Sequence, residues 1–170
     1  MDKGFVHIYT GDGKGKTTCA FGLAARCAGY GKKVKIFQFL KAMPTGEISS
    51  LEKIGVEIVR INSCENFYYD MTDEEKQLTK TEVEKHIYNI FSAKYDLIIL
   101  DEIICVVKNG IISIDKIIEI IKNKPENTEL VLTGRSMPRE LLEYADYVSE
   151  IKCIKHPFSK GIEAREGIDF

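Results

Sequence analysis

The sequence has little net charge and no long hydrophobic run, and each absence excludes a class of protein. Its 24 basic and 26 acidic residues give a formal net charge of −2, so non-specific binding to nucleic acid, which needs a basic face, is not expected. No apolar stretch approaches the roughly 18 residues of a membrane span, and the opening Met-Asp-Lys-Gly lacks the hydrophobic region of a signal peptide. We expect a cytoplasmic protein that binds neither nucleic acid nor membrane.

Cysteine and histidine patterns typical of zinc sites and disulfide frameworks are also missing. The five cysteines are scattered without a C-x-x-C, which disfavours a zinc site or a disulfide framework and fits a reducing cytosol. The three histidines form no pair at metal-ligand spacing, and no Ser/His/Asp or Cys/His set follows from the spacing. An enzyme of this sequence would therefore act by holding and polarising its substrate rather than through a protein nucleophile.

Short apolar runs alternate with helical patterns along all 170 residues. The runs predict strands at Phe5–Thr10, Lys33–Leu40, Val56–Ile61, Tyr95–Glu102, Glu129–Arg135 and Asp146–Ile154. Helices are expected at Lys16–Ala28, after the capping box Thr72–Glu75, after a Ser113 cap and near Pro138–Tyr144. We expect one α/β domain over residues 1–170: a doubly wound, mostly parallel sheet of about six strands with helices on both faces, of the P-loop NTPase (RecA-like) type. Its ligands should bind at the carboxyl ends of the strands.

The stretch YTGDGKGKTT, Tyr9–Thr18, is one residue short of the phosphate-binding pattern G-x-x-x-x-G-K-[ST], because the first usable glycine is Gly11. Glycines at alternating positions let backbone N–H groups converge on an anion, and the following helix adds its positive end. Lys14 and Lys16 bring charge, and the Thr17 hydroxyl is a suitable magnesium ligand. The alternative is a plain glycine turn, but strand, loop and helix occur here in the order that phosphate binding requires.

Charged side chains follow other predicted strands. Asp101 and Glu102 end an apolar run, where many P-loop proteins complete a magnesium site; a solvated strand end is the alternative, and either carboxylate is a candidate ligand. Arg135 and Lys41 are candidates for phosphate contact, and a surface position is the alternative for Arg135. Arg26, about ten residues beyond the loop, is a candidate for nucleotide binding or for a structural salt bridge.

Three aromatic residues, Phe67, Tyr68 and Tyr69, lie in a predicted loop after the third strand. Loop aromatics often pack back onto the fold. The functional alternative is a flat apolar surface for a large planar ligand.

These motifs together resemble one family. The loop TGDGKGKTT, the segments QFLK, PTGE, LDE and LTGR, and the tail VSEIKCIKHPFSKGIEAREGIDF resemble the P-loop corrinoid adenosyltransferases, the CobA/BtuR/CobO family, over about Phe5–Phe170. The resemblance implies transfer of the 5′-deoxyadenosyl group of ATP to the Co(I) centre of cobalamin or a precursor, with triphosphate leaving. It implies that Thr17 and Glu102 hold Mg²⁺ (or Mn²⁺). It also implies that ATP is held in the reverse direction and that Lys16 is important for catalysis. The residues that would hold the nucleotide are Gly11, Asp12, Gly13, Lys14, Gly15, Lys16, Thr17 and Thr18.

The resemblance also assigns the aromatic loop. Phe67 matches a phenylalanine, and Tyr69 stands where the family has a tryptophan; the two would form a wedge beneath the corrin that expels the lower axial ligand of Co(II) and eases its reduction. Implied partners are a second copy of the chain, as a homodimer, and an electron donor such as a flavodoxin or a flavin reductase. Members often carry a basic N-terminal arm that closes the partner's site, so we expect closure to differ here or the site to be more open.

Two other functions fit the residues. One is a P-loop ATPase or small-molecule kinase in which Glu102 orients water and Arg135 stabilises charge, although no arginine-rich lid insertion is evident. The other is a non-catalytic, ATP-dependent corrinoid-binding module. The reaction products distinguish all three.

Overall fold

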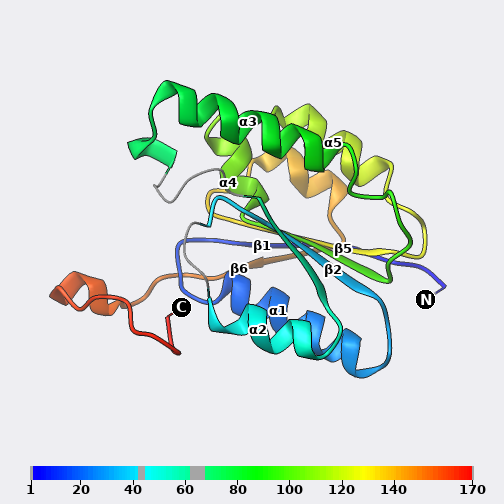
Figure 1. Cartoon of the computed structure of the whole chain (residues 1–170), viewed down its shortest axis with the longest axis horizontal. Coiled ribbons are helices and arrows are strands. Elements are labelled where there is room, and N and C mark those ends of the chain that lie inside the picture. Colours follow the sequence, from blue (N-terminus) through cyan, green and yellow to red (C-terminus); the bar gives the residue numbers. More distant parts are fainter. Residues whose placement is uncertain (1, 42–44, 62–67, 170) are drawn as a thin grey trace.

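The computed structural model describes residues 2–41, 45–61 and 68–169 and shows a twisted sheet between two layers of helices (Figure 1). Every strand pairing is parallel, and the six strands lie in the order β3-β2-β4-β5-β1-β6. Their bounds are β1 Val6–Thr10, β2 Val34–Phe39, β3 Glu57–Ile61, β4 Leu97–Asp101, β5 Glu129–Thr133 and β6 Tyr147–Glu150. The predicted α/β class with a doubly wound sheet is confirmed.

The helices are divided between the two faces of the sheet (Figure 1). One face carries α1 (Lys16–Gly29) and α2 (Gly46–Lys53); the other carries α3 (Asp73–Ile87), α4 (Ile103–Lys108) and α5 (Ile114–Lys122). Three short 3₁₀ helices complete the described elements: η1 Tyr68–Asp70, η2 Arg139–Tyr144 and η3 Pro157–Lys160. None of the described helices combines the length and the apolar character that crossing a membrane requires.

Two hydrophobic clusters, one on each face, hold the layers together. On the α1 side, Phe21 and Ala24 pack with Ile36 of β2 and Ile99 of β4. The opposite cluster is larger and contains the inward residues of α3, α4 and α5. All five residues of β4 are buried, as expected of a central parallel strand covered on both faces.

Local signals explain where several helices begin. The Thr72 hydroxyl accepts the Glu75 backbone N–H, and the Glu75 carboxylate accepts that of Thr72, which completes the predicted capping box of α3. The Ser113 side chain likewise caps α5 by accepting the Lys116 N–H. α3 ends at Ile87, and the buried Ile90 lies in the turn that follows, so burial continues beyond the end of the helix.

The structure differs from the sequence prediction in four places. α2 and α4 were not predicted: α2 buries only Leu51, and α4 has six apolar-rich residues that read as an extension of the preceding strand. The strand expected over Asp146–Ile154 is only Tyr147–Glu150, and the helix expected near Pro138–Tyr144 is the 3₁₀ turn Arg139–Tyr144. β6 is an exposed strand at the edge of the sheet, so burial of side chains does not favour a longer strand here.

Candidate active site

The shortened glycine loop connects β1 to α1 and forms the floor of a cavity of about 1010 Å³. Gly11 and Gly15 have φ values of 103° and 125°, which are open to glycine and strained for other residues. A Cβ on Gly11 would lie 2.4 Å from the carbonyl oxygen of Ile151. The Gly13 N–H also donates to that carbonyl, at 2.8 Å. The loop is therefore closely packed against Ile151.

Lys16 lies in the first turn of α1 with only 6% of its surface exposed. Its ammonium donates to the carbonyl of Gly13 at 2.8 Å, so the side chain curls back over the loop. Burial, followed by the nearby positive charge of Arg135, lowers the pKa of Lys16. An anion in the cavity would relieve both effects, which is the setting expected of a phosphate-binding lysine.

The strand register brings polar residues from neighbouring strands to one edge of the sheet. Gln38 of β2 pairs with Asp101 of β4, and Leu100 of β4 pairs with Leu132 of β5, so Asp101 and Thr133 end their strands side by side. Both residues are completely buried. This edge faces the N-terminus of α1, where Thr17 lies.

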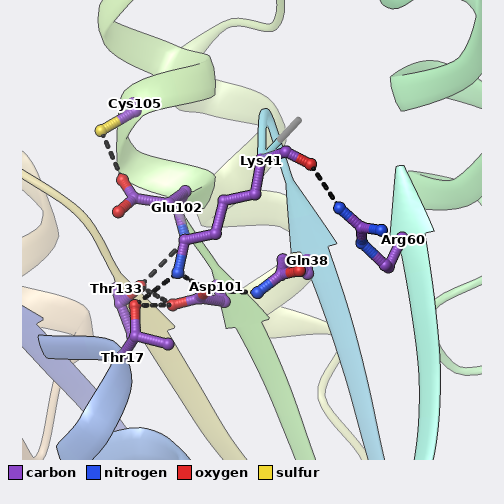
Figure 2. Close-up of polar contacts among 8 residues, drawn as sticks. All are labelled: Thr17, Gln38, Lys41, Arg60, Asp101, Glu102, Cys105 and Thr133. Atoms are coloured by element: carbon purple, nitrogen blue, oxygen red, sulfur yellow. Dashed lines mark hydrogen bonds and ion pairs between the residues drawn. The ribbon is translucent and has the colours of Figure 1, made fainter. Parts of the chain in front are cut away.

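A hydrogen-bonded network joins these residues around the Asp101 carboxylate (Figure 2). Oδ1 accepts the hydroxyls of Thr133 at 2.7 Å and Thr17 at 3.0 Å. Oδ2 lies 2.8 Å from Lys41 Nζ and accepts Gln38 Nε2 at 3.4 Å. Asp101 is thus surrounded by four donor side chains, from α1, β5 and the end of β2, and does not line the cavity.

Glu102, unlike Asp101, faces the cavity. Its φ of 64° turns the chain immediately after β4, and its residue lines the cavity. The Thr133 hydroxyl accepts its backbone N–H at 2.9 Å, and its Oε2 accepts the thiol of Cys105 at 2.8 Å. Burial and the nearby Glu102 charge raise the pKa of Cys105 to about 11, so this thiol keeps its proton at neutral pH.

Left-handed backbone recurs at this edge. Leu40 after β2, Glu102 after β4 and Ser136 after β5 have φ values of 54°, 64° and 57°. Non-glycine residues in this region are uncommon and tend to gather at functional sites. Here they lie beyond the carboxyl ends of three adjacent strands, where an α/β sheet binds its ligands.

The C-terminal segment forms a further wall of the cavity. Residues 155–158, 162–165 and 167–169 line it, although every residue of 155–169 is exposed. Lys14 of the loop forms an ion pair with Asp169 and donates to the Ile168 carbonyl at 3.1 Å. Arg165 also pairs with Asp169, at 3.0 Å. The tail is thus attached to the glycine loop mainly by charge.

The donors present fit a hard cation bound together with phosphate. Thr17 and Glu102 both line the cavity and offer a hydroxyl and a carboxylate, the oxygen donors that magnesium prefers. Among the residues that the structure describes, no three His, Cys, Asp or Glu side chains gather into a complete metal site. A cation here would therefore complete its coordination with ligand phosphates and water, as magnesium commonly does.

The structure brings most of the predicted site residues together. The loop residues Asp12–Thr18, together with Lys41, Glu102 and Arg135, line the cavity, and Gly11 lies at the start of the same turn. Arg26 lies in the last turn of α1, about 15 Å along the helix from Lys16.

The proposed aromatic wedge is only partly visible. Tyr69 belongs to η1 and is 77% exposed. Phe67 lies outside the described residues.

The sequence did not predict Gln38, Cys105 or the tail as parts of the site. It also did not predict that the Thr133 hydroxyl donates to Asp101. Polar residues at the ends of buried strands are the signal that identifies Gln38 and Thr133, since an unpaired polar group there is unfavourable. Cys105 had no signal, because α4 itself was not predicted. The tail contributes to the family resemblance, but that resemblance does not indicate that it lines the cavity.

Comparisons with known proteins agree along the whole chain. The family model described as ATP:corrinoid adenosyltransferase BtuR/CobO/CobP matches residues 2–170. The corrinoid adenosyltransferase of Escherichia coli K12 is 36% identical over 172 residues, which cover 99% of this chain and 87% of that protein. Corrinoid adenosyltransferase CobA of Salmonella typhimurium is 34% identical with the same coverage, and the Pseudomonas aeruginosa enzyme is 33% identical over 99% of this chain and 85% of its own. The chain belongs to the ATP:corrinoid adenosyltransferase family.

Proposed function

We propose that the protein transfers the 5′-deoxyadenosyl group of ATP to the Co(I) centre of a corrinoid and releases triphosphate. The observation that carries this proposal is the family match over residues 2–170 combined with a glycine loop one residue shorter than the ordinary pattern. An ordinary loop serves attack at the γ-phosphorus, whereas this reaction breaks the bond between carbon 5′ and its oxygen. A different loop suits a different position of the nucleotide.

The glycine loop and its neighbours would hold the triphosphate. Backbone N–H groups of Gly11–Thr18 and the N-terminus of α1 offer donors to the phosphates, and Lys16 and Arg135 add positive charge at the cavity wall. Because triphosphate is the leaving group, these charges stabilise it increasingly as the carbon–oxygen bond breaks. Thr17 and Glu102 would hold the magnesium ion, which supplies further neutralisation of that charge when bound.

The two carboxylates take different roles in this proposal. Glu102 faces the cavity and would contact the ion directly. Asp101 is fully buried and would act through Thr17, whose hydroxyl proton it accepts. That hydrogen bond leaves the lone pairs of Thr17 Oγ1 directed away from Asp101.

The transfer itself needs no proton from the protein. The filled cobalt orbital of Co(I) attacks carbon 5′, a cobalt–carbon bond forms, and the electron pair of the broken carbon–oxygen bond leaves with the triphosphate. Cobalt is formally oxidised from Co(I) to Co(III). The protein positions the two substrates and stabilises the leaving group.

The corrinoid side of the site is assigned by residue type. Phe67 and Tyr69 would form the apolar surface beneath the corrin, with tyrosine in place of a larger aromatic ring. Generating Co(I) requires an electron donor, for which a flavodoxin or flavin reductase is suitable. We further propose a cytoplasmic homodimer.

Product analysis tests the function. Purified protein, ATP, magnesium and chemically reduced cobalamin should yield tripolyphosphate and a light-sensitive cobalt–carbon bond in equal amounts. ADP and phosphate as main products would favour an ATPase or kinase, and nucleotide-dependent corrinoid binding without product would favour a carrier. E102Q is the matched control, because it keeps the shape of the side chain and removes the charge that would hold magnesium.

A further inference from the structure

The ammonium of Lys41 lies among the oxygen atoms at the edge of the sheet (Figure 2). Its Nζ is 2.8 Å from Thr17 Oγ1 and 2.8 Å from Asp101 Oδ2. Thr17 is also the hydroxyl that the proposed magnesium site requires. One positive side chain thus contacts the same hydroxyl oxygen that a divalent cation would use.

Asp101 explains why a cation is needed at this point. Its side chain is 0% exposed, and a buried carboxylate without a positive partner is strongly unfavourable. Lys16, the other loop lysine, donates to the Gly13 carbonyl instead. Of the ion pairs that the structure gives for the described residues, the one to Asp101 comes from Lys41.

The ammonium and a divalent cation are poor neighbours. A magnesium ion on Thr17 Oγ1 would lie about 2.1 Å from that oxygen. The Lys41 ammonium, hydrogen-bonded to the same atom, would then be within a few ångströms of a double positive charge. Binding of one therefore disfavours the other.

The surroundings of Lys41 allow its side chain to leave while its backbone stays. Arg60 of β3 donates to the Lys41 carbonyl at 3.0 Å, which ties the end of β2 to its neighbour. The side chain is 23% exposed and its residue lines the cavity, so the ammonium has open space on the phosphate side.

Gln38 adds an independent sign that the network is incomplete. Its Nε2 donates to Asp101, but among the residues that the structure describes its buried Oε1 has no hydrogen-bond partner. Buried polar atoms without partners are uncommon in folded proteins. A hydrated cation near Asp101 brings water donors, so the position of the Lys41 ammonium beside Asp101 suits a hydrated ion as well.

We infer that Lys41 is a positioning residue that takes the place of the divalent cation in the nucleotide-free protein and is displaced toward the triphosphate when the metal binds. The inference rests on the proposed nucleotide–metal site. It goes beyond that site by giving Lys41 two alternating anionic partners, the Asp101 carboxylate and the phosphates. The alternative is a permanent ion pair that neutralises Asp101 in every state.

Manganese binding to the nucleotide-free protein separates the two. Mn²⁺ is titrated at pH 8 in the absence of ATP and corrinoid, and the free ion is followed by electron paramagnetic resonance. K41M, which keeps the length of the side chain and removes its charge, should bind Mn²⁺ at least about tenfold more tightly than wild type. K41R retains the charge and should match wild type. The double variant K41M/D101N should lose the gain.

Unchanged or weaker Mn²⁺ binding by K41M would overturn the inference. Stability gives a second readout: the unfolding midpoint of K41M should fall without metal and recover on adding Mn²⁺, because Asp101 then regains a positive partner. A permanent ion pair predicts a loss that Mn²⁺ does not restore.

If K41M does not fold, wild-type protein still decides. Acetylation of Lys41 Nζ, measured by mass spectrometry, should accelerate at least about threefold when Mn²⁺ saturates the site, because the ammonium leaves its carboxylate partner. An unchanged rate would contradict the displacement. None of these measurements uses adenosyl transfer, so their failure is distinguishable from failure of the proposed function.

Discussion

Asp101 and Glu102 are adjacent in the sequence, yet they lie in different surroundings. Asp101 ends a strand buried on both faces and is enclosed by two hydroxyls, an amide and an ammonium. Glu102 adopts the left-handed conformation and reaches the cavity. The left-handed φ of Glu102 thus accompanies the change from a buried carboxylate to one that faces the cavity.

This difference predicts opposite effects of two isosteric substitutions. E102Q should weaken magnesium-dependent nucleotide binding by about tenfold or more and leave the unfolding free energy nearly unchanged, since no buried charge is lost. D101N should lower the free energy of unfolding by about 2 kcal/mol, because Lys41 loses its charged partner and one amide hydrogen lacks an acceptor. Calorimetry with nucleotide and denaturant titration measure the two effects. Equal effects on binding and stability in both variants would contradict the assignment.

The second prediction concerns Lys16. K16A removes a buried ammonium from the proposed triphosphate site and should lower the rate of transfer by on the order of 10²-fold, as loss of a preorganised donor typically does. Single-turnover kinetics with chemically reduced cobalamin isolate this step from reduction. A rate within twofold of wild type would exclude Lys16 from the site.

Cys105 predicts a dependence on alkaline pH. Its pKa in the folded protein is about 11, above the ordinary thiol value near 9. The folded state therefore holds a proton that the unfolded state has released, and stability falls as the pH rises from 9 to 11. Because other groups titrate there too, the test is the difference from C105A, whose stability should fall less, by about 1 kcal/mol given that the thiol is only partly buried. Parallel pH profiles of the two proteins would contradict this.

At the scale of elements, the site depends on how closely α4 lies against the end of β5. Gly134 follows β5 with a φ of 147°, and a Cβ added there would lie 2.7 Å from the Cβ of Ile104. α4 begins directly after Glu102. Any displacement of α4 therefore moves the carboxylate that faces the cavity.

G134A should consequently weaken both the fold and the proposed magnesium site. We expect about 2 kcal/mol lower stability, from backbone strain and the forced shift of α4, and weaker magnesium-dependent nucleotide binding. G29A is the control, since Gly29 ends α1 with open space around it and no positive φ. If G134A behaves like G29A, the packing against α4 does not position Glu102.

The same elements show what the sequence could predict. The strands and α1 follow from short apolar runs and the glycine loop, and the caps at Thr72 and Ser113 locate α3 and α5. α4 was missed because a six-residue helix of isoleucine, valine and cysteine has no helical period to detect. Its contribution to the site, the Cys105–Glu102 hydrogen bond, was therefore not predictable.

Contacts across the sheet were equally hidden. The Asp101 network depends on the register that aligns β2, β4 and β5, which no local pattern specifies. The sequence located each residue at a strand end but could not assign Asp101 and Glu102 their different roles.

At the scale of the whole molecule, the cavity is lined both by residues at the edge of the sheet and by the exposed C-terminal tail. The tail is attached by the Lys14–Asp169 ion pair, and surface ion pairs contribute little to stability. The tail should therefore contribute little to the stability of the fold.

Truncation after Ile154 should leave the fold intact and impair the site. We expect the unfolding midpoint to change by less than about 2 °C, because residues 155–169 are exposed, and nucleotide affinity to fall at least about tenfold. K14M, which breaks the ion pair alone, should give an intermediate loss. A truncated protein with normal nucleotide affinity would show that the tail is not a wall of the binding site.

In the proposed transfer, the bond between carbon 5′ and its oxygen breaks while the triphosphate stays whole. ATP labelled with ¹⁸O at the 5′ oxygen, incubated with the protein, magnesium and cob(I)alamin, tests it directly by mass spectrometry of the products. If this bond breaks, the label appears in tripolyphosphate and is absent from the adenosylated corrinoid. Label retained in ADP, with phosphate as the other product, would contradict it.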